Sequence, residues 1–301
     1  MRQEKKQTKL RHKIEYLAFM IFIMMVKISP LFLSGLNRKM ICFLFKKTNK
    51  KYYRLVTENL KIAFPDASDA KIAKLRDKVY RHFSTIFIEI INMFVKKNPE
   101  KIVKNITVNN IGNLEKALEK KAGVIIFTAH FGNWELVPYI LNREMNRHIF
   151  GIARHMDNPL VEKLVKKSRE FMGLKVIYKD NAVKAILSAL KNNQIIYFLI
   201  DQNAIAREAV PIDFFGKQVN AVTSVSRLHV KKGVPIVPLF LHYEKDRIVL
   251  NILEEIRFAG TGDEQKDIKN LTIQCNGLIE EQVKQYPEQW FWFHNRWKIA
   301  Y

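Results

Sequence analysis

Short apolar runs alternate with stretches of helical spacing through about the last two thirds of this 301-residue chain, and this alternation restricts its fold more than any other feature. Such alternation is typical of α/β proteins with a mostly parallel central sheet flanked by helices. The chain is 48% hydrophobic, so it can build the large core that such a sheet requires. The predicted strands are 124–127, 148–152, 175–178, 195–200, 236–241 and 247–253, and the predicted helices lie near 134–145, 159–172, 181–192, 221–232 and 265–285.

Polar residues follow three of these predicted strands directly. His130 comes after the first strand, Arg154 after the second, and Asp201 with Gln202 after the fourth. In open α/β sheets, ligands bind beyond the carboxyl ends of the parallel strands. If these strands are parallel, the sequence predicts a binding or catalytic site at that edge.

The stretch HFGNWE contains a histidine and a glutamate five positions apart. Positions i and i+5 do not share one face of a helix, so His130 and Glu135 can meet only if the histidine lies in a turn before the helix. Gly132 permits an unusual backbone conformation in such a turn, and Asn133 is a suitable N-cap. Pro138 prefers the first helical position, which indicates a helix that begins later or is kinked.

A carboxylate behind an imidazole makes a general base. If Glu135 accepts the proton of one ring nitrogen, the other ring nitrogen of His130 stays basic. The alternative is a glutamate that caps a helix and a histidine with a structural hydrogen bond. Spacing alone leaves both interpretations open.

Several common sites are not supported by the sequence. It has no HExxH, GxxxxGK[ST], GxGxxG or GxSxG pattern, and neither its eight histidines nor Cys42 and Cys275 form a metal-binding or paired-cysteine motif. We therefore expect no metal, no cofactor and no serine nucleophile. A base without an enzyme nucleophile suggests that a substrate hydroxyl, deprotonated by histidine, attacks an activated acyl group directly.

The N-terminal region is basic and contains a long apolar run. Lys and Arg number 51 against 29 acidic residues, a formal charge of +22, which favours anionic partners. Residues 14–26 form an apolar helix of about 20 Å, shorter than the roughly 30 Å hydrocarbon core of a bilayer, and Pro30 would bend a longer one. We expect a membrane-associated helix within one leaflet, held by its basic flanks. A spanning helix, a cleaved signal peptide and a buried core helix are the alternatives.

These features divide the chain into three segments. Residues 1–56 hold the basic N-terminus and the membrane-associated helix, and residues 57–104 form a helical segment. The latter includes a long amphipathic helix at 69–97, indicated by its apolar spacing. Residues 105–301 form the α/β catalytic domain.

Five segments resemble those of a known family, and they occur along the chain in the same order as in that family. The pattern from His130 to Glu135 is similar to the H-x4-D/E motif of glycerolipid and lipid A acyltransferases. With the other four segments, the chain resembles the secondary (late) acyltransferases of lipid A biosynthesis, within the lysophospholipid acyltransferase-like superfamily. Arg207 and Glu208, and Ile-Asp before Phe214, depart from the family pattern. The other segments are TENLKIAFPD from Thr57, ARHMDNPLVEKL from Ala153, DQNAIAREAVPIDFFG from Asp201 and YPEQWFWFHNRWK from Tyr286.

The resemblance implies a glycerolipid acyltransferase-like fold and transfer of a fatty acyl chain from acyl carrier protein to a hydroxyl of a lipid A precursor. It also implies the bacterial inner membrane, with the catalytic domain facing the cytoplasm. The acidic carrier protein, an anionic glycolipid acceptor and a membrane surface all suit a basic chain. In this interpretation His130 is the general base and Glu135 orients it. The candidates for substrate binding or site ordering are Arg154, Arg169, Asp201 and Gln202.

Two other functions stay open. The same chemistry would serve an acyltransferase with another acceptor, such as a lysophospholipid or a mannosylated lipid. A non-catalytic, polybasic protein of membrane surfaces or nucleic acids is a remote alternative, and no named nucleic-acid motif supports binding to nucleic acid.

Overall fold

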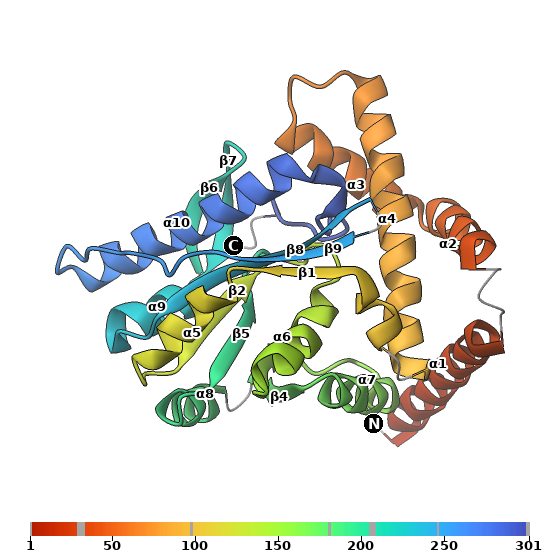
Figure 1. Ribbon diagram of the computed structural model, residues 1–301. Coiled ribbons are helices and arrows are strands. Elements are labelled where there is room, and N and C mark those ends of the chain that lie inside the picture. Colours follow the sequence, from red (N-terminus) through yellow and green to blue (C-terminus); the bar gives the residue numbers. More distant parts are fainter. Residues whose placement is uncertain are drawn as a thin grey trace.

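The computed structural model describes residues 2–28, 34–96, 99–179, 182–204, 209–245 and 247–298. A seven-stranded sheet with the order β1-β9-β8-β2-β5-β3-β4 forms its centre (Figure 1). Every neighbouring pair is parallel except β8 and β9, which form an antiparallel hairpin. The predicted α/β class with a mostly parallel sheet is therefore confirmed. The strands are β1 (Ile106–Asn109), β2 (Val124–Thr128), β3 (Ile149–Ala153), β4 (Leu174–Tyr178), β5 (Ile195–Leu199), β8 (Ile236–Glu244) and β9 (Arg247–Ile252).

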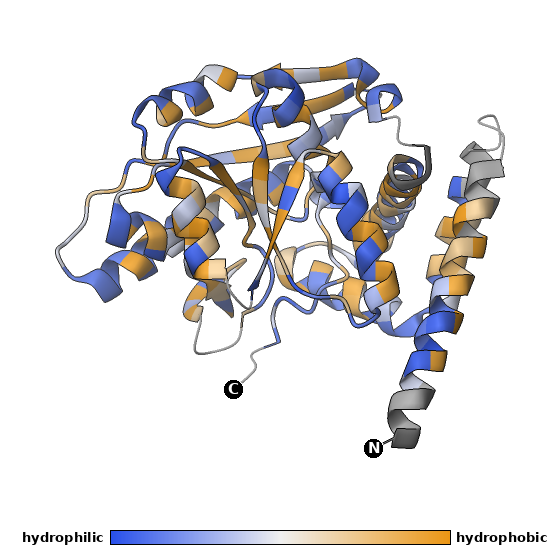
Figure 2. Cartoon of the chain, turned by 90° about the horizontal axis from the view of Figure 1, so that it is seen from below, coloured by the Kyte–Doolittle hydropathy of each residue, from blue (hydrophilic) through white to orange (hydrophobic). Residues whose placement is uncertain are grey.

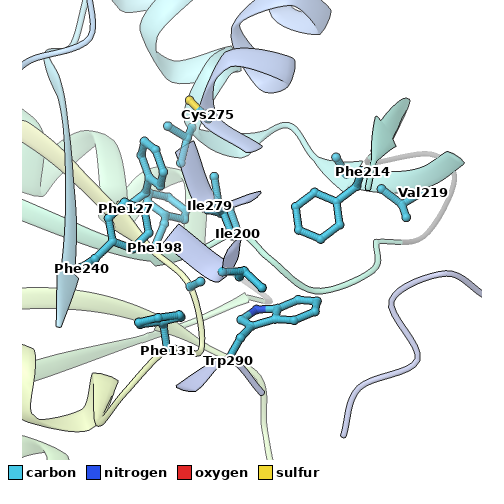
Figure 3. Close-up of a cluster of buried hydrophobic side chains, with 14 of the residues drawn as sticks. Phe127, Phe131, Phe198, Ile200, Phe214, Val219, Phe240, Cys275, Ile279 and Trp290 are labelled. Carbon is cyan, nitrogen blue, oxygen red and sulfur yellow. The ribbon is translucent and has the colours of Figure 1, made fainter. Parts of the chain in front are cut away.

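Helices cover both faces of the sheet, because successive side chains of a strand point to opposite faces. Ile125 and Phe127 of β2 pack in one cluster with α8, α9 and α10, whereas Val124 and Ile126 pack in the other with α5 and α6. Figure 3 shows the first cluster, in which aromatic side chains of the sheet lie below Cys275 of α10. The helices of the body are α5 (Ile111–Glu119), α6 (Val137–Met145), α7 (Pro159–Phe171), α8 (Ala182–Lys191), α9 (Ser224–Lys232) and α10 (Glu264–Gln285).

Three strands were missed by the sequence interpretation. β1 has only four residues, none of them fully buried, so its apolar signal is weak. The strands β6 (Ala209–Phe214) and β7 (Lys217–Val222) form a separate hairpin. Phe215 and Gly216 connect them with φ values of 53° and 70°, and positive φ at both central residues is the requirement of a type I′ hairpin turn.

The described N-terminal part consists of four helices joined by short connections. It contains α1 (Arg2–Ile28), α2 (Ser34–Thr48), α3 (Lys50–Ala63) and α4 (Asp69–Lys96). The predicted apolar helix at 14–26 lies within α1, and the predicted helix at 69–97 corresponds to α4. The expected bend at Pro30 lies outside the described residues.

The helix α1 is not the buried core helix that was one alternative. It lies at one side of the molecule, and Figure 2 shows hydrophobic residues along it. Five large apolar side chains of α1 are 51–60% exposed, namely Leu10, Ile14, Leu17, Ile21 and Met24. Within the described ranges, no helix combines the length and the apolar character needed to cross a bilayer.

Candidate active site

The turn that carries His130 leaves the end of β2 and precedes a helix, as predicted. A short 3-10 turn at Trp134–Leu136 follows, and α6 begins at Val137, so the helix starts after the motif. Gly132 has a φ of +53°, and a Cβ there would lie 2.2 Å from the carbonyl oxygen of Leu241. Only glycine fits this backbone conformation and this close approach.

A buried aspartate, rather than Glu135, holds the imidazole of His130. His130 Nδ1 lies 2.8 Å from Asp201 Oδ1, and the backbone N–H of His130 donates to Asp201 Oδ2 at 3.0 Å. The indole N–H of Trp290 also donates to Oδ2, at 2.8 Å. Since a carboxylate accepts, Nδ1 carries the ring proton of neutral His130, and Nε2 keeps its lone pair.

Asp201 is ionised even though it is only 2% exposed. Burial by itself would raise its pKa, but the charge of His130 and the hydrogen bonds from His130 and Trp290 outweigh burial and hold the pKa of Asp201 below its usual value. The site therefore contains a fixed negative charge behind the imidazole. Strand order explains the contact, because β2 and β5 are adjacent and parallel, and their carboxyl ends meet.

The prediction that Glu135 orients His130 is wrong in this geometry. Arg169 of α7 donates to both carboxylate oxygens of Glu135, from Nε at 3.0 Å and from Nη2 at 2.5 Å. The charge of Glu135 raises the pKa of Arg169, against the opposing effect of burial. The planar guanidinium matches a carboxylate with two parallel hydrogen bonds, which explains why Glu135 turns toward α7.

One buried tyrosine lies near members of both charge pairs. The hydroxyl of Tyr197, on β5, donates to the carbonyl oxygen of Trp134 at 3.1 Å. Burial and the charges of Glu135 and Asp201 raise the pKa of Tyr197 well above its usual value, while Arg169 opposes them. Both carboxylates therefore act on the same side chain, and the pairs belong to one region of the molecule.

The other predicted site residues differ in their distance from the imidazole. Gln202 reaches it, with Nε2 at 3.4 Å from Nε2 of His130. Arg154 is exposed just after β3, and none of the hydrogen bonds or ion pairs found among the described residues involves it. Arg207 and Glu208 lie outside the described residues.

An aromatic cavity of about 710 Å³ lies beside His130. The rings of Trp134 and Phe291 line it, and their centroids lie 5.0 Å and 6.1 Å from that of His130. Most of its walls come from α2, α4 and the C-terminal aromatic segment. The remaining lining residues are Phe45, Thr48, Asn49, Tyr52, Tyr80, Phe83, Ile86, Phe87, Ile90, Phe293 and His294.

The C-terminal segment, from which the sequence analysis drew no site residue, also builds the site. The carbonyl oxygen of Gln289 accepts from the N–H of Gly132 at 2.9 Å, and the N–H of Phe291 donates to the carbonyl oxygen of His130 at 3.0 Å. Arg296, fully buried, donates to the carbonyl oxygen of Gln202 at 2.8 Å. Phe131 and Trp290 form an isolated antiparallel bridge, and Figure 3 shows both in the lower part of the buried cluster. The run of aromatic residues in YPEQWFWFHNRWK was the available signal.

Asn133 has a different role from the predicted one. It stands at the N-cap position of the 3-10 turn without a capping hydrogen bond from its side chain. Its Nδ2 instead donates to Glu89 of α4 at 3.0 Å, and the hydroxyl of Tyr243 donates to the same carboxylate. Burial raises the pKa of Glu89, against these two hydrogen bonds. The motif turn is thus also tied to α4.

Fold and site together describe an α/β protein in which a histidine, held by a buried aspartate, lies at the carboxyl edge of a mostly parallel sheet. Within the described part of the chain, no cluster of three or more His, Cys, Asp or Glu residues is placed to hold a metal ion. The sequence matches the family described as bacterial lipid A biosynthesis acyltransferase over residues 3–299, and the chain belongs to that family. It is therefore an acyltransferase.

Three relatives illustrate the range of this similarity. The chain is 24% identical to lipid A biosynthesis acyltransferase 2 of Shigella flexneri, over 82% of this chain and 77% of that protein. It is 23% identical to the lipid A biosynthesis palmitoleoyltransferase of Escherichia coli (strain K12), over 83% and 79%. It is also 20% identical to a phosphatidylinositol mannoside acyltransferase of Mycolicibacterium smegmatis, over 64% and 63%.

Proposed function

We propose that this acyltransferase moves a fatty acyl group from a thioester of acyl carrier protein to a hydroxyl group of a lipid A precursor, with His130 as the general base. The observation that carries the proposal is the 2.8 Å contact between His130 Nδ1 and Asp201 Oδ1. This contact leaves the Nε2 lone pair for the acceptor hydroxyl. The family supports a lipid A-type acceptor.

The proposed reaction needs no group beyond the two substrates and this site. His130 Nε2 takes the proton of the acceptor hydroxyl, whose oxygen attacks the carbonyl carbon of the thioester. The tetrahedral adduct collapses with cleavage of the C–S bond, and the imidazolium returns the proton to the leaving thiolate. Asp201 stabilises the imidazolium between these two steps. The products are an ester and a free thiol.

The other site residues have supporting roles in this proposal. Gln202, close to Nε2, positions the acceptor hydroxyl. The pair of Glu135 and Arg169 sets the charge around Tyr197 and holds the motif turn against α7. Arg154, exposed at the same edge of the sheet, binds a phosphate group of the acceptor. The aromatic cavity takes an acyl chain, because each buried methylene group contributes about 0.8 kcal/mol.

We further propose that α1 lies in the plane of the membrane surface on the cytoplasmic side of the bacterial inner membrane. Its five exposed apolar side chains recur at intervals of four and three residues, so they form one stripe. Lys9, Arg11 and Lys13 are exposed beside this stripe and suit anionic headgroups. Residues 1–56 then provide attachment, residues 57–104 supply part of the cavity wall through α4, and residues 105–301 carry the chemistry. Leu17→Ser with Ile21→Ser should reduce sedimentation with anionic vesicles, and unchanged sedimentation would contradict this proposal.

A second acceptor is favoured by one observation, the similarity to a phosphatidylinositol mannoside acyltransferase. The same histidine chemistry would acylate a mannosylated lipid. Parallel assays with a lipid A precursor and a phosphatidylinositol mannoside, each with the same acyl carrier protein thioester, separate the two. We expect transfer to the lipid A precursor.

Mass spectrometry of lipid A from cells with and without the protein tests the function directly. Expression should add the mass of one acyl chain, and His130→Ala should abolish that addition. His148→Ala, at an exposed histidine, is the matched control and should retain it. A folded His130→Ala variant that still acylates would contradict the proposed base, and the absence of any mass change would contradict the lipid A acceptor.

A further inference from the structure

The motif turn is attached to α4 through a closed ring of hydrogen bonds. Asn133 Nδ2 donates to Glu89 Oε2 at 3.0 Å, and the hydroxyl of Tyr243 donates to the same oxygen at 2.5 Å. The backbone N–H and the carbonyl oxygen of Tyr243 both bind the side-chain amide of Gln289, each at 2.8 Å. The carbonyl oxygen of Gln289 accepts from the N–H of Gly132 at 2.9 Å. Gly132 directly precedes Asn133 in the turn, so the ring is closed.

Glu89 is the member of this ring that belongs to the wall of the aromatic cavity. It lies on α4 between Ile86 and Ile90, which both line the cavity. Asn133 is fully buried and lies three positions after His130. The hydrogen bond between Glu89 and Asn133 therefore joins the turn that carries the base to the helix that lines the cavity.

The remaining attachments of the base come from other parts of the fold. Asp201 accepts from the ring and from the backbone N–H of His130, and the N–H of Phe291 donates to the carbonyl oxygen of His130. These contacts join the base to the end of β5 and to the C-terminal segment. The contact of Glu89 adds the connection to α4.

We propose that Glu89 is a positioning residue for acyl transfer, which holds the imidazole of His130 in register with an acyl group bound against α4. It acts through Asn133 and does not touch the substrates. The inference rests on the proposed function, since it assumes that His130 is the base and that the aromatic cavity takes the acyl chain. A misplacement of about 1 Å can lower a rate by about a hundredfold, so the loss of one such contact has a measurable effect on kcat.

Steady-state kinetics of Glu89→Ala tests the positioning role. With an acyl carrier protein thioester and a lipid A precursor, the variant should lower kcat by about ten- to a hundredfold. The KM for the thioester should change little, because every side chain that lines the cavity is retained. Glu115→Ala, at an exposed glutamate of α5, is the matched control and should keep the wild-type kcat and KM. A raised KM with an unchanged kcat would overturn the inference.

The conservative variant separates the hydrogen bond from the charge. Both donors to Glu89 are neutral, and its other carboxylate oxygen makes no hydrogen bond to a described residue. The amide of Glu89→Gln can therefore keep an oxygen toward Asn133 and Tyr243 and place its nitrogen where the other oxygen lies. This variant should retain most of the wild-type kcat. A loss as large as that of Glu89→Ala would contradict positioning by this contact.

Exchange of the two partners provides a rescue test. Asn133→Asp places a second carboxylate against Glu89, and repulsion between like charges should lower kcat. Adding Glu89→Gln to Asn133→Asp restores a donor and an acceptor in the opposite direction, so the double variant should recover part of the lost kcat. Tyr243→Phe leaves the contact between Glu89 and Asn133 in place and should cost less than Glu89→Ala. No recovery in the double variant would count against the proposed contact.

Thermal unfolding and the pH profile distinguish positioning from a purely structural role. Glu89→Ala should keep the wild-type dependence of kcat on pH, because Asp201 still holds the imidazole. A lower unfolding temperature with a wild-type kcat in the folded variant would show a structural role only and overturn the inference. If His130→Ala abolishes transfer and Glu89→Ala does not lower kcat, the proposed function stands and this inference is rejected. Transfer that persists in His130→Ala would reject both.

Discussion

The two carboxylates of the site differ in the partner that each one holds. Glu135 is five positions from His130 but binds Arg169 of α7, whereas Asp201, 71 positions away, binds the imidazole. Asp201 follows β5, which lies next to β2 in the sheet, and Glu135 lies in a turn that faces α7. Adjacency in a parallel sheet therefore decides which polar groups meet, and distance along the chain does not.

The largest effect should come from breaking the contact at Asp201. Asp201→Asn should lower kcat by about a thousandfold or more, because an amide can hold the imidazole in the wrong tautomer and cannot stabilise the imidazolium. Glu135→Gln, which leaves His130 and Asp201 in place, should cost far less. Both variants are measured with the same acyl carrier protein thioester and lipid acceptor, after circular dichroism shows that each is folded.

The pH profile and a rescue variant distinguish orientation of the base from general damage. Asp201→Glu should recover part of the lost kcat, because it restores a carboxylate behind the ring. It should also restore a pH profile that follows ionisation of the histidine. If Glu135→Gln instead loses as much kcat as His130→Ala, the assignment of the two carboxylates would have to be reversed.

The second-largest effect should be the coupling between Glu135 and Arg169 in the free energy of unfolding. Each single change, Glu135→Gln or Arg169→Gln, leaves the other side chain partly buried with its charge unpaired, since their side chains are 13% and 28% exposed. The double variant should therefore lose less stability than the sum of the two, by about 1–3 kcal/mol. Urea unfolding measures this difference. Additive losses would show that the pair contributes no coupling.

Much of the fold followed from the sequence because it depends on local pattern. The buried run at β2 and the start of α7 at Pro159 were predicted correctly, and Asn158 caps this helix by accepting from the N–H groups of Leu160 and Val161. The placement of His130 and Asp201 at the same edge of the sheet also followed, since that placement needs only parallel strands.

The pairing within the site could not be read in this way. Which carboxylate reaches the imidazole depends on strand order and on the direction of one 3-10 turn. Neither of these features produces a periodic pattern of residues in the sequence. The hydrogen bond from Trp290 to Asp201 joins segments 89 positions apart and has the same limitation. The aromatic cavity likewise combines residues of α2, α4 and the C-terminal segment.

The smallest expected effect is the dependence of stability on pH at Asp201, and it tests whether this carboxylate is charged in the folded protein. In the folded protein the pKa of Asp201 is lowered by His130 and Trp290 despite burial, whereas an aspartate in the unfolded chain has a pKa of about 3.9.

A carboxylate whose pKa is lower in the folded state stabilises the protein above about pH 3.9, and this contribution is lost as the pH falls through the pKa of the folded state. Asp201→Asn lacks the titration, so the stability advantage of the wild type should be constant near neutral pH and shrink below about pH 4. Urea unfolding of both proteins between about pH 7 and pH 3 measures it. If the difference in unfolding free energy between the two proteins stays constant over this pH range, the pKa of Asp201 is not lowered by folding. The hydrogen bonds from His130 and Trp290 would then give the carboxylate no preference for the ionised form.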